Sequence, residues 1–377
     1  MNIVKKRRAL IAAGGTGGHF YPGLALGREL SRRGWQVVFI VKEGDISAPA
    51  LDAEGLPYVE IPAAALPRSL NPLRHLLFLA RFLAGLRRTS RVLADYSPDA
   101  VFGAGSYVSF PAVLLAALRG IPRVVHESNA VFGLGNRVAG SLCQAVALGL
   151  PVDDDPFAGR SVMTGTPVRD FIPPKISREE ARERLGLGLS VPVIAAFGGS
   201  QGAAALNAAL AAAAGELKTG GIPFQILHVA GRGNAEKTRL AYASAGLGGD
   251  LAVKVLDYCA EMDLLYAAAD IIVSRSGAST VAELAAVRKP AVLIPLPAAA
   301  GGHQDANAAV LARAGAAVSL AQGPGLPARL AGELRRLLSD GGAATAMSAA
   351  YAKTGVPDPA GAAAALADLI DGGKHRS

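Results

Sequence analysis

The stretch Ala12-Ala13-Gly14-Gly15-Thr16-Gly17-Gly18-His19 decides how this chain is interpreted. It follows a short apolar run at residues 9–13 and precedes a helical pattern at residues 22–33. Glycines at such a junction let the chain turn tightly and bring backbone N–H groups close to a ligand. The helix that begins behind them adds a positive dipole end. The stretch therefore indicates either a tight strand-to-helix connection or the first loop of an anion-binding site.

Two well-known phosphate-binding motifs do not fit this loop. A dinucleotide fingerprint would need a glycine at position 20, where Phe20 stands. A P-loop would need Gly-Lys followed by Ser or Thr, but His19 occupies that region. The glycines therefore serve a ligand of another kind, if they serve one at all.

Strand-like apolar runs alternate with helical stretches along the chain. The runs lie at residues 9–13, 36–41, 100–102, 123–126, 145–148, 192–197, 224–230, 252–255, 271–274, 291–295 and 317–320. Such alternation predicts βαβ units with parallel sheets. Runs that are apolar throughout are typical of strands covered on both faces.

The domain boundary is expected in the proline-containing stretch at residues 166–175. We predict an α/β protein of two doubly wound domains, residues 1–168 and residues 169–377, which face a cleft. An alanine-rich helix is expected after Asp358. Its placement stays open, and packing back on the first domain is one outcome.

The charge of the chain is moderately basic, with a net charge of +8. Residues 1–170 hold 19 basic and 13 acidic side chains, so the excess lies mainly in the first part. This distribution suggests an anionic ligand or an anionic surface, or simply a solvated basic face. The sequence has no zinc-finger spacing and no RNA-binding aromatic signature, so we expect no nucleic acid partner.

Neither a disulfide framework nor a membrane span is expected. The two cysteines, Cys143 and Cys259, lie far apart, which favours a reducing compartment. The apolar run near the start is too short for a secretory signal, and no window is long enough to cross a bilayer.

Small-residue loops recur after other predicted strands. They lie at residues 103–109, 197–203 and 274–283, in both halves of the chain. The carboxyl ends of parallel strands are where α/β sheets bind ligands. A ligand with phosphates and sugar hydroxyls would suit such loops.

The ordered set of these motifs resembles the MurG family, the UDP-N-acetylglucosamine-dependent transferases of peptidoglycan synthesis. The resemblance runs from about residue 9 to about residue 320. The motifs are residues 14–19, His126-Glu-Ser-Asn129, Gly165-Thr-Pro-Val-Arg169, residues 198–203, Arg275-Ser-Gly-Ala278 with Glu283, and His303-Gln304 with Asn307.

The resemblance implies a GT-B fold, with two Rossmann-like domains, the acceptor mainly on the first and the donor mainly on the second. It implies an inverting transfer of N-acetylglucosamine to the muramoyl 4-hydroxyl of lipid I, which gives lipid II. The enzyme would work as a peripheral protein on the cytoplasmic face of the inner membrane. Neither a metal nor a cofactor is expected, and residues 153–155 are interpreted as a solvated acidic loop.

The same resemblance implies a set of substrate contacts. Thr16, Gly17 and Gly18 would face the donor, Asn129 and Gln304 its sugar, and Ser200 its diphosphate, with Arg169 near the linker. Residues 278–283 would wrap the nucleotide, with Glu283 on the ribose hydroxyls and Cys259 near uracil through its backbone. The nucleotide-wrapping residues are Ala278, Ser279, Thr280, Val281, Ala282 and Glu283.

The base that takes the acceptor proton is left between two candidates. A neutral imidazole can act near pH 7, so His19 is the first choice, unless it only orients the loop or the acceptor. Glu127 is the second, and it could equally orient His126 or cap local backbone.

Some positions depart from the family pattern. Ser128 stands for a glutamine and Thr166 for an asparagine. Ser106 and Phe110 stand for glycines in the second loop, near the expected site of the acceptor diphosphate.

Residues 66–91 form a basic and apolar segment. They include six arginines, His75 and many leucines, but no acidic residue. Such a segment can lie at an anionic membrane interface. The alternative is a helix packed into the first domain with its arginines outside.

Two other functions remain open at this point. A UDP-sugar 2-epimerase could share the architecture, but it would need several carboxylates in the cleft and nothing directed to a membrane. A binding-only module would hold the nucleotide without any transfer.

Overall fold

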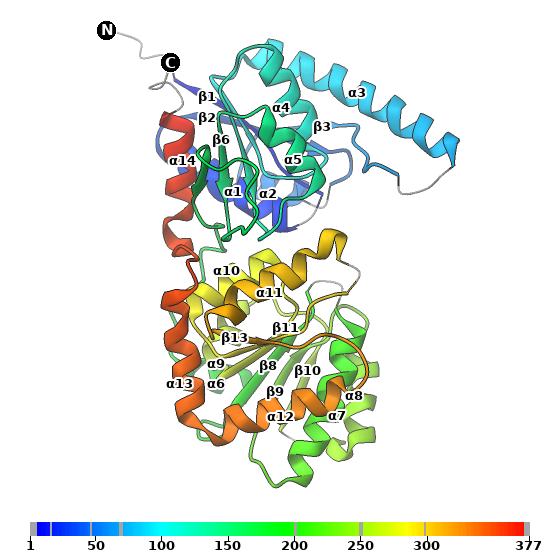
Figure 1. Cartoon of the computed structure of the whole chain (residues 1–377), viewed down its shortest axis with the longest axis vertical. Helices are drawn as coiled ribbons and strands as arrows, with labels where there is room; N and C mark the ends of the chain where they lie inside the picture. Colours follow the sequence, from blue (N-terminus) through cyan, green and yellow to red (C-terminus); the bar gives the residue numbers. More distant parts are fainter. Residues whose placement is uncertain are drawn as a thin grey trace. The chain divides into compact units, whose positions relative to one another are not determined.

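The structure is a computed structural model of the chain, and it describes residues 6–15, 17–45, 47–67, 71–199, 202–248, 252–297 and 299–372. The chain divides into two compact units (Figure 1). We name them the first unit, Met1–Arg169 with Val356–Ser377, and the second unit, Asp170–Gly355. Residues from both ends of the sequence therefore belong to the first unit.

Within the described residues, the first unit contains a sheet of seven parallel strands in the order β3-β2-β1-β4-β5-β6-β7. The order of the first six strands is that of a doubly wound nucleotide-binding sheet. In chain order the strands are β1 (Arg8–Ala12), β2 (Gln36–Lys42), β3 (Tyr58–Ile61), β4 (Ala100–Gly103), β5 (Arg123–Glu127), β6 (Ala145–Leu148) and β7 (Ser161–Met163).

Helices cover both faces of this sheet. Alternate residues of a strand point to opposite faces. Ile11 of β1 therefore packs in one cluster with α1 (Gly17–Arg32) and α14 (Ala362–Gly372), whereas Leu10 packs in another with α3 (Pro72–Tyr96) and α4 (Ser109–Leu118). The helices of the first unit are α1 (Gly17–Arg32), α2 (Ala48–Ala53), α3 (Pro72–Tyr96), α4 (Ser109–Leu118), α5 (Leu134–Ser141) and, after the short turn η4 (Pro359–Gly361), α14 (Ala362–Gly372).

The described part of the second unit repeats this topology with a six-stranded parallel sheet in the order β10-β9-β8-β11-β12-β13. Its strands are β8 (Val193–Phe197), β9 (Gln225–Val229), β10 (Val253–Leu256), β11 (Ile271–Ser274), β12 (Ala291–Leu293) and β13 (Ala317–Ser319).

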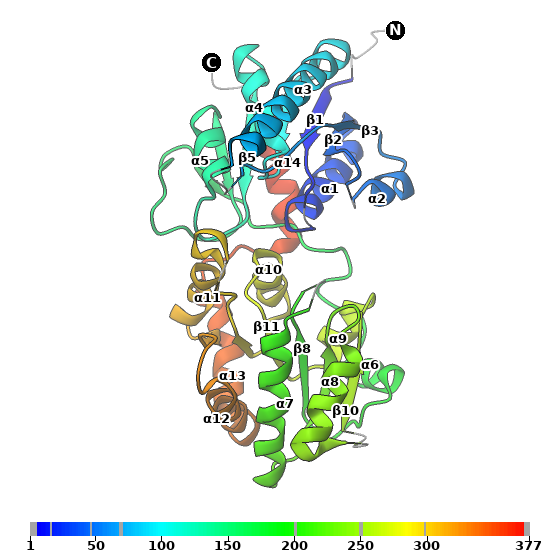
Figure 2. The ribbon, with the colours of Figure 1, turned by 90° about the vertical axis from the view of Figure 1, so that its right-hand side faces the viewer.

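Helices also pack on the sheet of the second unit. In Figure 2, α7 (Ala204–Thr219) runs between α12 (Leu326–Ser339) and α8 (Ala235–Tyr242), and it contacts both. The helices are α6 (Arg178–Leu185), α7 (Ala204–Thr219), α8 (Ala235–Tyr242) with the π-helical turn η1 (Ala243–Leu247), α9 (Met262–Ala268), α10 (Ala278–Val287), η2 (Ala300–Gly302) with α11 (His303–Arg313), α12 (Leu326–Ser339), and α13 (Gly341–Ala350) with η3 (Tyr351–Lys353).

The last helix, α14, is attached to the first unit by charge as well as by apolar packing. Arg33, just after α1, pairs with Asp368 at 2.6 Å and with Asp371 at 2.9 Å. The Trp35 indole N–H donates to Asp371 at 3.2 Å, and the guanidinium of Arg7 lies over the Trp35 ring. The alanine-rich end of the sequence thus completes one face of the first sheet.

The structure confirms the predicted α/β fold of two doubly wound parallel sheets, with three local differences. The strands β3 and β7 were not predicted, because they lie at the two edges of the sheet, stay partly exposed and have no continuous apolar run. The first helix begins at Gly17 rather than at Pro22. Pro22 lies inside the helix near its start, where a missing N–H removes a single backbone hydrogen bond.

Candidate active site

The first glycine loop is held by a carboxylate that the sequence reasoning did not single out. Gly15 N donates to Asp45 Oδ2 at 2.7 Å, and a Cβ on Gly14 would lie only 2.9 Å from the same oxygen. Both glycines have positive φ, 143° and 84°, a backbone conformation that other residues rarely adopt. Asp45 follows β2, so the loop is fixed from the neighbouring strand. Thr16 lies outside the described residues.

His19 lies in the first turn of α1, directly after Gly17 and Gly18. Its Nδ1 is 3.2 Å from the carbonyl oxygen of Ala104. A carbonyl can only accept, so Nδ1 carries the proton and Nε2 is the basic nitrogen of the neutral ring. This tautomer is the one that a general base at Nε2 requires.

Glu127 has both carboxylate oxygens engaged by its own loop. Asn129 donates to Oε1 from its backbone N and from Nδ2, each at 3.0 Å. Gly133 N at 3.1 Å and Asn136 Nδ2 at 2.8 Å donate to Oε2. The side chain is buried. These contacts favour the loop-capping alternative for Glu127 over the role of a base, and they fix the orientation of Asn129.

His126 is fully buried beneath the same loop. Its Nε2 donates to the Gly165 carbonyl and its Nδ1 accepts from Ser128 Oγ, each at 3.2 Å. Burial lowers the pKa of His126 to about 4, so the ring stays neutral. His126 therefore ties β5 to residue 165, and the Ser128 that replaces a glutamine takes part in this tie.

The second loop, between β4 and α4, is closed by its own serines. Ser106 Oγ accepts from Val108 N at 3.2 Å, and Ser109 Oγ donates to the Ser106 carbonyl at 2.7 Å. Phe110 stacks on Phe82 of α3, which stacks in turn on Phe78. The two departures from the family pattern thus have local roles: one closes the loop and the other connects it to α3.

In the second unit, the third glycine loop links β8 to α7. Gly199 and Gly202 have positive φ, and Gly202 N donates to the Gly199 carbonyl at 2.9 Å. A Cβ on Gly202 would lie 2.2 Å from the carbonyl oxygen of Ala230, so only glycine fits there. Ser200 lies outside the described residues.

The β11–α10 junction carries the expected nucleotide segment. Residues 278–283 form the first turns of α10, and Glu283 is buried there. The hydroxyl of the fully buried Tyr266 donates to Glu283 Oε2 at 2.8 Å. Tyr266 therefore orients the carboxylate, although no sequence motif marked it.

Gln304 is held against the loop after β12. Its Oε1 accepts from Leu296 N at 2.9 Å, and its backbone carbonyl accepts from Ser276 Oγ at 2.7 Å. The buried Arg275 donates to the carbonyls of Ile294 and Pro295 at 2.8 and 2.9 Å. The amide nitrogen Nε2 is thus the donor end of a fixed Gln304 carboxamide.

The remaining predicted residues lie near strand ends or at the unit boundary. Cys259 follows β10, is partly buried, and its thiol donates to the Glu261 carbonyl at 3.3 Å. Arg169 is the last residue of the first unit before the chain enters the second. Among the described residues, no group of three or more His, Cys, Asp or Glu side chains is arranged to hold a metal ion.

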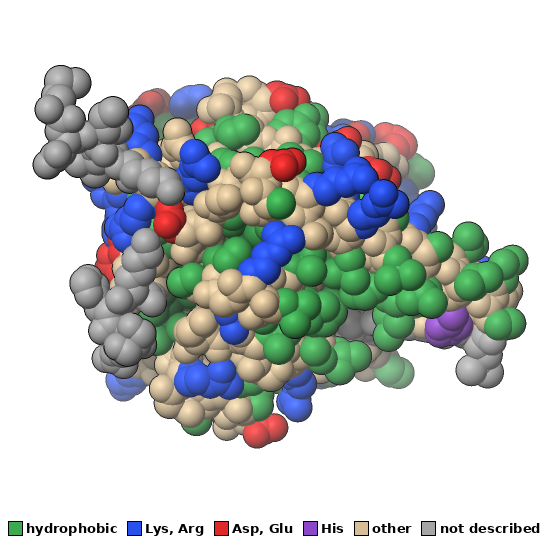
Figure 3. Space-filling view, turned by 90° about the horizontal axis from the view of Figure 1, so that it is seen from above, with side chains coloured by type: hydrophobic (Ala, Val, Ile, Leu, Met, Phe, Trp, Pro, Cys, Tyr) green, Lys and Arg blue, Asp and Glu red, His purple; other side chains and the backbone are tan. Residues whose placement is uncertain are grey.

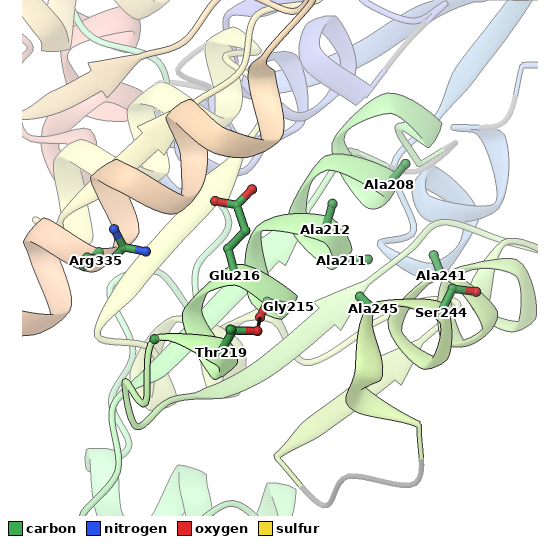
Figure 4. A pocket seen from close by; sticks show the side chains of 11 residues that line it. Ala208, Ala211, Ala212, Gly215, Glu216, Thr219, Ala241, Ser244, Ala245 and Arg335 are labelled. Carbon is green, nitrogen blue, oxygen red and sulfur yellow. Dashed lines mark hydrogen bonds between the residues drawn. The ribbon is translucent and has the colours of Figure 1, made fainter.

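A hollow of about 870 Å³ in the second unit lies away from these loops. It is lined mainly by small side chains of α7, η1 and the end of α8, and its charged lining residues are Glu216 and Arg335 (Figure 4). Most of its α7 residues belong to the C-terminal half of that helix, remote from the glycine loop. We therefore do not assign it to the candidate active site.

Two domain families match the chain, one over the sheet of the first unit and one over the sheet of the second unit. Residues 9–148 match the glycosyltransferase family 28 N-terminal domain, and residues 193–361 match the glycosyltransferase family 28 C-terminal domain. CalG4, the calicheamicin glycosyltransferase, shares the fold alone, at 18% identity and a TM-score of 0.67, over 99% of both chains. Two doubly wound units of this kind define a glycosyltransferase of the GT-B class.

Closer relatives narrow this class. The UDP-N-acetylglucosamine--N-acetylmuramyl-(pentapeptide) pyrophosphoryl-undecaprenol N-acetylglucosamine transferase of Elusimicrobium minutum (strain Pei191) is 36% identical over 365 residues, 97% of this chain and 99% of the relative. The crystal structure of Acinetobacter baumannii MurG matches at 30% identity with a TM-score of 0.77, over 97% of this chain and 99% of the other. The chain belongs to the MurG family of N-acetylglucosamine transferases.

The two buried histidines predict a specific pH dependence of stability. Burial lowers the pKa of both His126 and His228 from 6.5 to about 4. Below pH 6.5 both histidines are therefore protonated in the unfolded chain but not in the folded chain. The free energy of unfolding falls as the pH falls toward 4. Between pH 7.5 and pH 5 we expect each histidine to lower the free energy of unfolding by about 2 kcal/mol.

Urea unfolding of the wild type and of His228→Gln at pH 7.5 and pH 5 measures this loss. The variant should lose less stability than the wild type over this interval, whatever its stability at pH 7.5. Equal losses in the two proteins would show that His228 is not a buried neutral group.

Proposed function

We propose that the chain transfers N-acetylglucosamine from UDP-N-acetylglucosamine to the muramoyl 4-hydroxyl of lipid I, with inversion, and so forms lipid II of peptidoglycan. The observation that carries this proposal is the similarity over nearly the whole chain, at 36% identity, to a relative named for that transfer. In this proposal the first unit binds the acceptor and the second unit binds the UDP-sugar.

The acceptor hydroxyl gives up its proton to His19 Nε2. The Ala104 carbonyl supports this role because it fixes the tautomer through Nδ1. Glu127 acts by holding Asn129, whose carboxamide contacts the donor sugar. Thr16, Gly17 and Gly18 face the donor in this proposal.

The departing UDP carries the negative charge that grows as the anomeric carbon becomes oxocarbenium-like. The N-terminus of α7, with Ser200, and the guanidinium of Arg169 stabilise that charge. Preorganised donors of this kind are worth roughly 3 kcal/mol each in related sites. No metal or cofactor is assigned a role.

The nucleotide and the sugar are recognised by groups with fixed orientation. Glu283, set by Tyr266, accepts the ribose hydroxyls, and Ala278, Ser279, Thr280, Val281 and Ala282 surround the nucleotide. The backbone at Cys259 holds uracil. Gln304 donates from Nε2 to a sugar hydroxyl, since its Oε1 already accepts from Leu296 N.

A transfer assay tests the function directly. Labelled UDP-N-acetylglucosamine and a lipid I analogue should yield a labelled disaccharide product only in the presence of the enzyme. UDP-N-acetylmannosamine formed without acceptor would support the epimerase alternative. Nucleotide binding without transfer to the acceptor would support the binding-only alternative.

The role of His19 predicts a split between turnover and binding. His19→Asn keeps a side-chain donor for the Ala104 carbonyl but removes the basic nitrogen. We expect kcat to fall about a hundredfold or more, while the KM for UDP-N-acetylglucosamine changes by less than a few fold. A steady-state assay that found near wild-type kcat would exclude His19 as the base.

The role of Glu283 predicts a loss of ribose recognition. Glu283→Gln should weaken UDP binding about tenfold, because one charged acceptor of the ribose hydroxyls is lost. Calorimetry with UDP and with 2′-deoxy-UDP separates the loss of this contact from a general loss of folding, which would weaken the binding of both ligands. The variant should prefer UDP over 2′-deoxy-UDP less strongly than the wild type does, and an unchanged preference would contradict the assignment.

We also propose that the first unit docks on the cytoplasmic face of the inner membrane through α3. None of the described helices is long and apolar enough to cross a bilayer. The N-terminal half of α3 instead presents leucines to solvent, with Leu73, Leu76 and Leu83 each more than half exposed. Hydrophobic side chains gather along this protruding helix (Figure 3), and arginines continue along it. An apolar, basic helix of this kind suits an anionic interface.

This docking predicts weaker vesicle binding in Leu76→Gln/Leu83→Gln. Affinity for phosphatidylglycerol vesicles, measured by co-sedimentation, should fall at least about tenfold, because two exposed apolar side chains no longer enter the interface. Transfer to a short-chain acceptor in solution should persist. Leu240→Gln, an exposed leucine of the second unit, is the matched control and should bind like the wild type. Equal vesicle binding by the double variant would rule out α3 as the docking element.

A further inference from the structure

A chain of buried polar groups runs through the second unit from α8 to the third glycine loop. His228, fully buried in β9, lies 2.9 Å from Tyr242 Oη through Nδ1 and 3.1 Å from Asn207 Oδ1 through Nε2. Asn207, in the first turns of α7, donates from Nδ2 to the Ala230 carbonyl at 2.9 Å. Three elements, β9, α7 and α8, are thus joined by one line of hydrogen bonds.

Every proton in this line has a fixed place. The Ala230 carbonyl only accepts, so the amide nitrogen of Asn207 faces it and Oδ1 faces His228. Oδ1 must accept, so His228 carries its proton on Nε2. His228 Nδ1 then accepts from the Tyr242 hydroxyl. Burial agrees with this neutral arrangement, since it lowers the pKa of His228 and raises that of Tyr242.

The line ends at the described part of the glycine loop. The Ala230 carbonyl lies so close to Gly202 that a Cβ there would approach it to 2.2 Å. Asn207 N also donates to the Ala203 carbonyl at 2.9 Å, the residue that leads into α7. The position of the Ala230 carbonyl therefore limits where Gly202 and the first turn of α7 can lie.

We propose that Tyr242, His228 and Asn207 are positioning residues for the diphosphate-binding end of α7. The inference rests on the proposed function, in which that end stabilises the donor diphosphate. None of the three side chains touches the substrate. They hold the loop backbone so that the first-turn N–H groups of α7 keep the geometry that phosphate oxygens require.

If these three residues only stabilised the fold, apolar side chains would serve better at this place. Buried polar groups add little to the stability of the fold when they are paired, and they destabilise it strongly when a partner is lost. Apolar side chains would fill the same space without leaving an unpaired polar group. A line with one allowed proton arrangement instead specifies a single backbone position. The positioning role therefore predicts a defect that follows the phosphates of the ligand and not the nucleoside.

The test compares UDP with uridine, which lacks the diphosphate, in Tyr242→Phe. The variant removes the donor to His228 Nδ1 and keeps the ring. Its dissociation constant for UDP should rise about fivefold, the effect expected when a shifted loop no longer aligns one N–H group with a phosphate oxygen, while that for uridine changes less than twofold. In the transfer assay, KM for the donor should rise more than kcat falls.

Tyr351→Phe is the matched control. Tyr351 is buried in the same unit, and its hydroxyl donates to the Lys289 carbonyl at 2.9 Å, away from the glycine loop. It should lose stability without any change in the ratio of the two dissociation constants. Asn207→Ser, which removes both the Oδ1 acceptor and the Nδ2 donor of the carboxamide, should lower the preference for UDP over uridine further than Tyr242→Phe does.

The outcomes separate the inference from the function on which it rests. A wild type that binds UDP no better than uridine would overturn both the donor site and the inference. A wild type that prefers UDP, with Tyr242→Phe and Asn207→Ser each retaining that full preference, would overturn the inference alone. A lowered preference in both variants, with Tyr351→Phe unchanged, is the expected result.

Discussion

All strands of each described sheet run in the same direction, so their carboxyl ends and the helix N-termini that follow gather at one edge of that sheet. Backbone N–H and C=O groups of the connecting loops lie there without partners from the sheet, and the buried ones must find a hydrogen-bond partner. The polar residues of both units answer this requirement. Asp45 accepts from Gly15, Glu127 holds the 127–136 turn, and Asn207 and Arg275 bind carbonyls of the facing loops. These hydrogen bonds hold the described parts of the loops in place at the sheet edge.

The fold was predictable from the sequence because the interior strands are apolar throughout and the glycine loops follow them directly. The edge strands β3 and β7 escaped prediction because half-exposed strands leave no continuous apolar run. Motif resemblance pointed to Glu283, Asn129 and Gln304 as candidate site residues. It did not find Asp45, Tyr266 or the pair His228 and Tyr242, because nothing in their local sequence distinguishes them. Their importance comes from contacts between residues 14 to 30 positions apart in the sequence, which only the folded chain brings together.

Three histidines illustrate why residue type alone does not reveal a role. His126 and His228 lie within the strands β5 and β9, are fully buried and are neutral with both ring nitrogens engaged by protein groups. His19 lies at the start of a helix, only partly buried, and a carbonyl fixes its tautomer. The same imidazole thus serves as a rigid connector in the interior and as the proposed base at the sheet edge, and burial is what distinguishes these environments.

The attachment of α14 to the first unit has a consequence for the order in which the protein is made. Domains usually fold one after another as the ribosome extends the chain, beginning at the N-terminus. Here Leu366, Ala367 and Ile370 belong to the core that contains Ile11 and Phe39. The first unit to be synthesised therefore lacks part of its interior until the second has been translated in full. Until then, part of one face of its sheet stays uncovered beside α1, while the second unit, continuous in sequence, can fold without delay.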